Sequence, residues 1–129
     1  MRALLDTHIM LAVVRGNLDD EYPQIAQQLR DSSTESFVSV ASLWEMAIKT
    51  RLGKLDPGMK LEEVAGYLEA VGVSVLPISA AHVTTAIEPE PKTRDPFDRL
   101  LLGQCMAEDL MLVTVDRALL RHPLAMKRF

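Results

Sequence analysis

The sequence has one cysteine, no long apolar run and no excess of positive charge, and each shortage excludes a class of protein. Cys105 cannot form an internal disulfide, and the apolar helical pattern around it predicts a small buried side chain. The three histidines have neither one another nor cysteine at the spacing of zinc ligands, so no zinc site is indicated. No stretch approaches the roughly 18 uninterrupted apolar residues of a membrane span.

The net charge is −4, from 14 basic and 18 acidic residues. This balance argues against a protein that coats nucleic acid through a broad basic face, because such binding needs many cations to displace the counterions of the phosphates. This net charge is still compatible with an enzyme that binds nucleic acid through metal ions and a few local cations. The N-terminal segment 1–16 is apolar, but Asp6 and His8 interrupt it and no small-residue cleavage site follows, so we expect a cytoplasmic protein.

The composition, 129 residues of which 48% are hydrophobic and 25% charged, is that of one globular domain with a core. Strand-like runs alternate with longer stretches of helical periodicity, which predicts a three-layer α/β/α domain with a central, mainly parallel sheet. The predicted strands are 3–5, 36–40, 73–78 and 111–115, with 124–127 as a last short one. The predicted helices are 7–15, 22–31, 42–52, 60–71, 80–87, 96–108 and 117–121.

Four acidic residues each lie at or just beyond a short apolar run: Asp6, Glu45, Asp98 and Asp116. In an open α/β sheet, ligands bind at the carboxyl ends of the strands, so acids that are scattered along the chain can meet there. Clustered carboxylates repel one another unless a cation lies among them, and Mg²⁺ prefers oxygen ligands. The pattern predicts a metal-dependent enzyme that acts on phosphate.

Each acid also has a structural explanation. Asp6 and Asp116 stand between a strand and a helix, where Asp is a favoured N-cap. In the segment RDPFD, Asp95 fits the N-cap, which leaves Asp98 in the first helical turn, where the helix dipole favours an acid.

For Glu45, the spacing from Ser42 is that of a capping box, and Lys49 stands where a helix-stabilising ion pair would form. Capping alone would seldom place four acids at the same edge of a sheet, and the neighbours of Glu45 on its helix are mostly apolar. We therefore interpret the four acids as metal ligands and Asp95 as a structural cap.

Other residues carry weaker signals. Thr7 and Thr114 each lie beside one of the acids, where a hydroxyl would orient a carboxylate or a metal-bound water. Trp44 fits either a core position or a base-stacking role, and its Leu- and Met-rich helix favours the core. Arg94 and Arg99 stand on either side of the DPFD segment, either as phosphate ligands or as solvated side chains, and we favour solvated side chains.

The motifs LLDTHIMLAVV, VSVASLWEMAIKTRLGKL and RDPFDRLLLGQCMAEDLMLVTVDRALL resemble PIN-domain ribonucleases, specifically the VapC-type toxins of bacterial toxin–antitoxin pairs. The resemblance covers nearly the whole chain in order and implies one PIN domain over residues 1–129. Two departures, His8 in the first motif and LGQCMA in place of a more usual run of alanines, touch none of the acids.

The resemblance implies an endoribonuclease whose Mg²⁺ or Mn²⁺ site consists of Asp6, Glu45, Asp98 and the more variable Asp116. It also implies an RNA substrate, a cognate VapB-type antitoxin whose tail covers the acidic groove, and a homodimer. Our hypothesis for the reaction is that a metal-activated water attacks the phosphodiester in line and leaves a 5′-phosphate and a 3′-hydroxyl.

Two alternatives remain. A phosphoacceptor receiver domain is also a small α/β domain with acids at strand ends, but it needs two adjacent acids after its first strand and a Lys after a late one, and neither is present. A non-catalytic module that receives a partner's cations in an acidic groove differs from a nuclease, on sequence, only in how complete the set of acids is.

Overall fold

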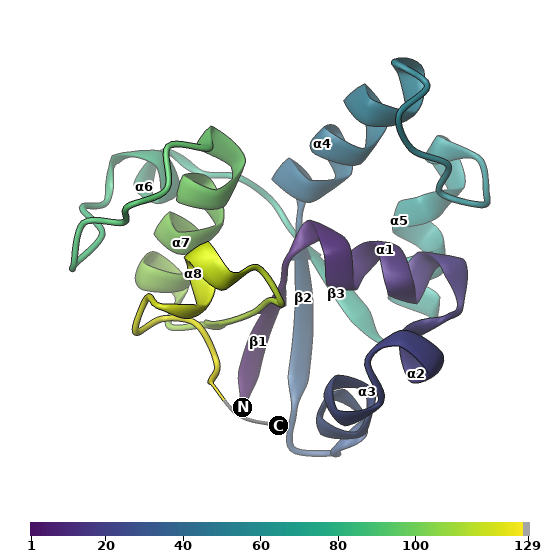
Figure 1. The fold of residues 1–129 in the computed structure, drawn as a ribbon, viewed down its shortest axis with the longest axis horizontal. Helices are drawn as coiled ribbons and strands as arrows, with labels where there is room; N and C mark the ends of the chain where they lie inside the picture. The colour runs from purple at the N-terminus through teal and green to yellow at the C-terminus, as the bar shows by residue number, and fades with distance from the viewer. Residues whose placement is uncertain (128–129) are drawn as a thin grey trace.

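The computed structural model describes residues 1–127 and contains a parallel sheet between two helical layers (Figure 1). The strands are β1 (Arg2–Leu5), β2 (Glu35–Ser39), β3 (Val73–Leu76) and β4 (Met111–Val113). They lie in the order β3-β2-β1-β4, and every neighbouring pair is parallel. The helices are α1 (Thr7–Arg15), α2 (Leu18–Glu21), α3 (Pro23–Arg30), α4 (Val40–Arg51), α5 (Leu61–Ala70), α6 (Ala80–Thr84), α7 (Pro96–Glu108) and α8 (Arg117–Leu120).

Strand β1 lies at the centre of the sheet and is buried on both faces. Its side chains alternate between two apolar clusters, because successive residues of a strand point to opposite faces. Ala3 and Leu5 pack with α1 and α5, whereas Leu4 packs with α7, β4 and α8. Helices therefore cover both faces of the sheet, which confirms the predicted α/β/α architecture with its parallel sheet. No helix in residues 1–127 is long and apolar enough to cross a membrane.

The structure corrects the predicted start of α4. The helix begins at Val40, directly after β2, and its N-cap is Ser39, whose hydroxyl accepts a hydrogen bond from the Ala41 amide at 3.0 Å. Ser42 consequently lies inside the helix, and the capping box predicted for Ser42 and Glu45 is wrong. The Glu45 side chain is therefore free of a capping role.

Several other boundaries differ from the prediction. Strands β3 and β4 end two residues early, and α6 ends at Thr84 instead of residue 87. Helix α2 was not predicted. The segment 124–127 does not form a strand: Ala125 makes a single parallel bridge to Leu112 of β4. These ends are set by tertiary packing, which a local pattern does not contain.

Two predictions for single side chains have opposite outcomes. Cys105 is fully buried in α7, as predicted, and burial raises the pKa of its thiol to about 12, so the thiol stays protonated. Trp44 is not a core residue, because 61% of it is exposed. Its ring instead meets Phe97 of α7 edge-on, with 5.6 Å between the ring centroids.

Helix α7 packs closely on α6 through Gly103, and this contact gives a stability prediction. A Cβ at position 103 would lie 2.6 Å from the carbonyl oxygen of His82, a distance that requires backbone movement. We expect Gly103→Ala to lower the free energy of unfolding by about 1–3 kcal/mol. The matched control is Gly66→Ala in α5, where a Cβ meets nothing within 4 Å and helix propensity should add about 0.5–1 kcal/mol. Equal urea midpoints for the two variants would contradict this contact.

Candidate active site

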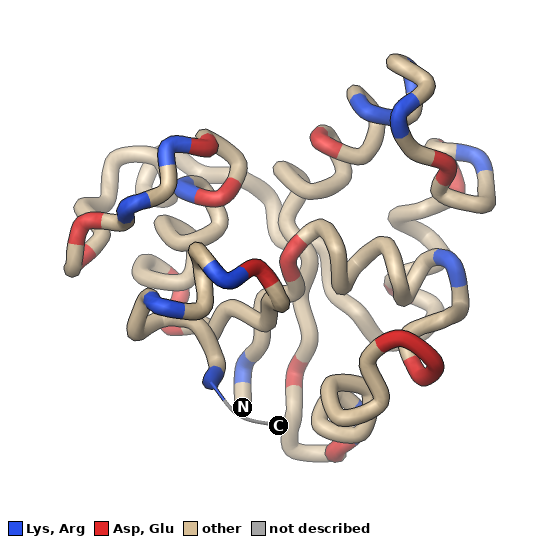
Figure 2. The backbone as a smooth tube through the Cα atoms, viewed as in Figure 1, with Lys and Arg blue, Asp and Glu red and all other residues tan. Residues whose placement is uncertain are grey.

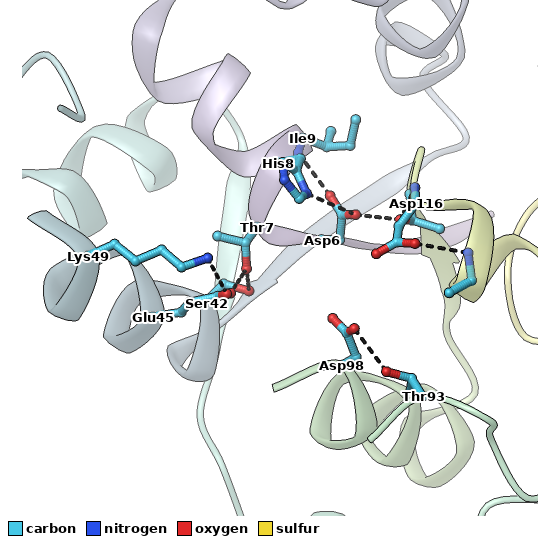
Figure 3. Close-up of polar contacts among 12 residues, drawn as sticks. Asp6, Thr7, His8, Ile9, Ser42, Glu45, Lys49, Thr93, Asp98 and Asp116 are labelled. Carbon is cyan, nitrogen blue, oxygen red and sulfur yellow. Dashed lines mark hydrogen bonds and ion pairs between the residues drawn. The ribbon is translucent and has the colours of Figure 1, made fainter. Parts of the chain in front are cut away.

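The four predicted acids lie around one cavity at the carboxyl edge of the sheet (Figure 3). Asp6 follows β1, and Asp116 follows β4, the strand paired with β1. Glu45 comes from α4 and Asp98 from the first turn of α7, which both begin near this edge. The cavity has a volume of about 130 Å³. Segments that are far apart in the sequence thus bring four carboxylates together, as the prediction required.

Asp6 is 3% exposed and accepts two hydrogen bonds. Its Oδ1 accepts from the Ile9 amide at 2.9 Å as the N-cap of α1, and its Oδ2 accepts from the Thr114 hydroxyl. Burial raises the pKa of Asp6, and the hydrogen bond from Thr114 opposes this effect. Asp6 therefore both caps α1 and faces the cavity, so the capping and ligand interpretations are compatible.

Glu45 is held by Thr7 and Lys49, and its side chain is 13% exposed. The Thr7 hydroxyl donates to Oε1 at 2.6 Å, and the Lys49 ammonium lies 2.8 Å from Oε2, as the predicted helix pair required. Thr7 does orient a carboxylate, but it is that of Glu45 and not that of its neighbour Asp6. The Ser42 hydroxyl lies 3.1 Å from that of Thr7 and completes the contact between α1 and α4.

Asp98 is partly buried and accepts a hydrogen bond from the Thr93 hydroxyl at 3.3 Å. The pKa of Asp98 is raised to about 6, first by burial and then by the negative charges of Asp95, Asp116 and Glu45. The negative charges of these neighbours therefore add to the effect of burial in disfavouring the ionised form of Asp98. Thr93 was not among the predicted site residues, although a Thr two residues before an N-cap Asp is a typical turn signal.

Asp95 and Asp116 are both N-caps. The Asp95 side chain accepts from the amides of Phe97 at 2.8 Å and Asp98 at 3.2 Å, which confirms the predicted cap of α7. The Asp116 side chain accepts from the Ala118 amide at 2.9 Å, while its own amide donates to the Thr114 hydroxyl at 3.0 Å. Thr114 is thus bonded to two of the four acids.

The contacts of two further side chains bear on their roles. His8 is exposed, and its Nδ1 lies 4.0 Å from Asp6 Oδ2, which is beyond hydrogen-bond distance. Arg99 is not a solvated side chain: it donates to the carbonyls of Pro91 and Thr93 and pairs with Glu90. These contacts stabilise the loop before α7.

The donor atoms at this cavity fit a hard divalent cation, since they are carboxylate and hydroxyl oxygens. As the side chains lie, however, no three carboxylates or imidazoles within residues 1–127 stand close enough together to hold an ion. Lys49 meanwhile pairs with Glu45 and supplies part of the positive charge that such a cluster needs. A divalent ion at this cavity would therefore require the carboxylates to lie closer together than they do here.

Comparison with known proteins settles the family. The model of the PIN domain family matches residues 3–123. The chain belongs to the PIN domain family. This match confirms the family that the three motifs predicted.

One solved structure similar to this PIN domain is that of VapBC2 from Rickettsia felis bound to a DNA fragment from their promoter. The TM-score is 0.64 and the sequence identity 20%, over 98% of this chain and 96% of that chain. At this identity the likeness supports the fold alone. No curated protein matches the sequence.

In this PIN domain, the Thr114 hydroxyl is expected to affect both the free energy of unfolding and the pKa of Asp6. Thr114→Val keeps the shape but removes the hydroxyl from Asp6, so it should lower the free energy of unfolding by about 1–3 kcal/mol. It should also raise the pKa of Asp6 further, because that hydrogen bond is the main factor that lowers it. Thr114→Ser, which keeps the hydroxyl, is the control. NMR titration of the Asp6 carboxyl and urea unfolding test both effects, and identical behaviour of the two variants would contradict them.

Proposed function

We propose that this PIN domain is a cytoplasmic VapC-type toxin, a divalent-metal-dependent endoribonuclease that a cognate antitoxin inhibits. The observation that carries the proposal is the convergence of Asp6, Glu45, Asp98 and Asp116 on one cavity in a member of this family. The antitoxin is supported by the similar structure, which is that of VapBC2 from Rickettsia felis, together with the resemblance in the motifs. The choice of RNA over DNA and the homodimer rest on the resemblance.

In this proposal Asp6, Glu45 and Asp98 hold Mg²⁺, for which Mn²⁺ can substitute, and Asp116 helps to bind the same ion or a second one. When bound, the ion supplies a water of lowered pKa as nucleophile and stabilises charge on the phosphate oxygens. Asp98 must lose its proton to take part, because its pKa of about 6 leaves part of it protonated in mildly acidic solution.

The hydroxyl and ammonium groups around the acids have positioning roles. Thr7 fixes the rotamer of Glu45, and Thr114 fixes that of Asp6, so two of the carboxylates are oriented before substrate arrives. Lys49 pairs with Glu45 and would have to release it if that carboxylate held an ion directly. Its exposed position on α4 lets the ammonium swing into solvent.

The test is cleavage of a mixed RNA pool by the purified protein with Mg²⁺, with Mn²⁺ and with chelator. We expect cleavage only with metal, and products with 5′-phosphate and 3′-hydroxyl ends. Calorimetric titration with Mn²⁺ distinguishes the nuclease from a non-catalytic acidic module, which needs no metal. Membership in the PIN family already excludes the alternative that the protein is a phosphoacceptor receiver domain. Cleavage that persists in chelator would refute the proposed metal dependence.

The charge of the acidic cavity leads to a prediction about the inhibitory segment of the antitoxin. An acidic groove attracts a basic side chain, which would occupy the place of the metal and block substrate. We expect the inhibitory segment of a cognate antitoxin to carry an Arg or Lys there, and inhibition to weaken when that cation is neutralised. Inhibition that survives removal of every cation from the segment would contradict an electrostatic block.

A further inference from the structure

A second cavity lies beside the acidic one, between the loop that precedes α7 and helix α8. Its volume is about 310 Å³, within the range of pockets that bind small ligands. Apolar groups form much of its wall, among them the rings of Pro89 and Pro91 on the loop, Leu102 of α7 and Ala118 of α8. Flat apolar walls of this kind suit a planar ring system.

The wall formed by the loop is anchored from two sides. Arg99 donates to the carbonyls of Pro91 at 3.2 Å and Thr93 at 3.0 Å. On the other side, His122 Nδ1 accepts from the Leu124 amide at 3.2 Å, so its Nε2 carries the proton and donates to the Pro89 carbonyl at 2.8 Å. The pocket therefore exists before a ligand arrives, which lowers the entropic cost of binding.

Two residues that line the pocket donate hydrogen bonds to acids of the first cavity. Thr93 donates to Asp98, and the amide of Ala118 donates to Asp116. A polymer whose phosphate lies at the acids would therefore have its neighbouring unit within reach of the pocket. Two wall residues of the pocket are thus in direct contact with two of the acids.

Two of the residues that line the pocket carry a positive charge. Lys92 and Arg121 line the pocket, and neither forms an ion pair with any residue in 1–127. Figure 2 shows further Lys and Arg positions along the same loop and on α8, interspersed with acidic positions on that loop. The carboxylate of Glu90, which also lines the pocket, is already paired with Arg99. An apolar slot rimmed by free cations complements a nucleotide, which joins a flat base to a phosphate.

We propose that this second cavity is a nucleotide subsite that binds the base next to the scissile phosphate of single-stranded RNA. The base packs against Pro89, Pro91 and Ala118, and Lys92 and Arg121 bind the phosphate of that nucleotide. This proposal rests on the proposed nuclease function. The subsite would give the enzyme a preference for particular bases next to the cleaved bond. It also directs the RNA across α8 and not across α4.

The first experiment measures binding without cleavage. A short single-stranded oligoribonucleotide is titrated into the full chain in chelator, and chemical shifts of the backbone amides are followed by NMR. We expect shifts at Ala118, Leu102 and Thr93. Lys92→Ala and Arg121→Ala should each weaken binding about threefold to tenfold and reduce the slope of log K against log salt by about 0.7. Lys54→Ala, the same charge change in the loop between α4 and α5, is the matched control and should leave the slope unchanged.

The second experiment fills the pocket. Ala118→Phe places a ring in the cavity but keeps the backbone amide that binds Asp116, so we expect tenfold weaker binding and an altered cleavage sequence preference with the melting temperature preserved. Ala118→Ser is the control. Parent-like binding and cleavage pattern in Ala118→Phe, or shifts produced only by an anionic peptide and not by RNA, would overturn the subsite and leave the nuclease proposal intact. Nucleotide binding as described without metal-dependent cleavage would instead overturn the proposed function.

Discussion

Asp98→Asn is expected to reduce metal-dependent RNA cleavage on the order of 100-fold or more and to raise thermal stability. The substitution keeps the size of the side chain but removes the charge that a metal ligand needs. It also removes a carboxylate that burial and three neighbouring acids destabilise in its ionised form. For a partly exposed group we expect a gain of about 1 kcal/mol at neutral pH, after allowance for solvent screening, or about 3 °C in melting temperature.

Asp95→Ala is the matched control three residues away, and it should behave in the opposite way. Asp95 caps α7 through two backbone amides, so its loss should cost about 0.5–2 kcal/mol. A substantial share of cleavage should remain, because the capping role of Asp95 does not require a metal. Cleavage assays with Mg²⁺ and melting curves on both variants separate the two roles. Parent-level cleavage by Asp98→Asn would end the assignment of this carboxylate to the active site.

Metal affinity is expected to fall about tenfold per pH unit below pH 6. The pKa of Asp98 is about 6, so below that value a proton must be displaced before the carboxylate can bind an ion. The pKa of Asp6, which burial also raises, acts in the same direction. Titration with Mn²⁺ between pH 4.5 and 8 measures the effect, and Asp98→Asn should bind metal weakly at every pH without a step near 6. A flat profile for the parent would contradict the raised pKa.

Stability without metal should change with pH in the opposite sense. A raised pKa means that the native state holds the proton of Asp98 more tightly than the unfolded chain does. Proton binding by Asp98 thus stabilises the native state at low pH. This stabilisation is lost as the pH rises from the ordinary pKa of 3.8 through about 6. Comparison of the parent with Asp98→Asn in metal-free buffer isolates this contribution from those of the other acids.

Much of the layered fold was predictable because its signals are local. The buried run before Asp6 and the alternation of strand and helix patterns predicted the parallel sheet. Parallel strands place their carboxyl ends at one edge, so the sequence also predicted that acids following β1 and β4 would meet. The cap formed by Asp95 was predictable for the same reason, since a cap is set by residues within one helical turn.

The tertiary structure alone decided which groups each acid meets. Thr7 and Glu45 are 38 residues apart in the sequence, and Thr114 and Asp6 are 108 apart, so no local pattern pairs them. The exposure of Trp44 depends on which neighbouring helices cover α4, and its Leu- and Met-rich helix misled the prediction. Periodicity reports which face of an element is apolar, whereas the partner of a polar atom is fixed by the packing of elements from distant parts of the chain.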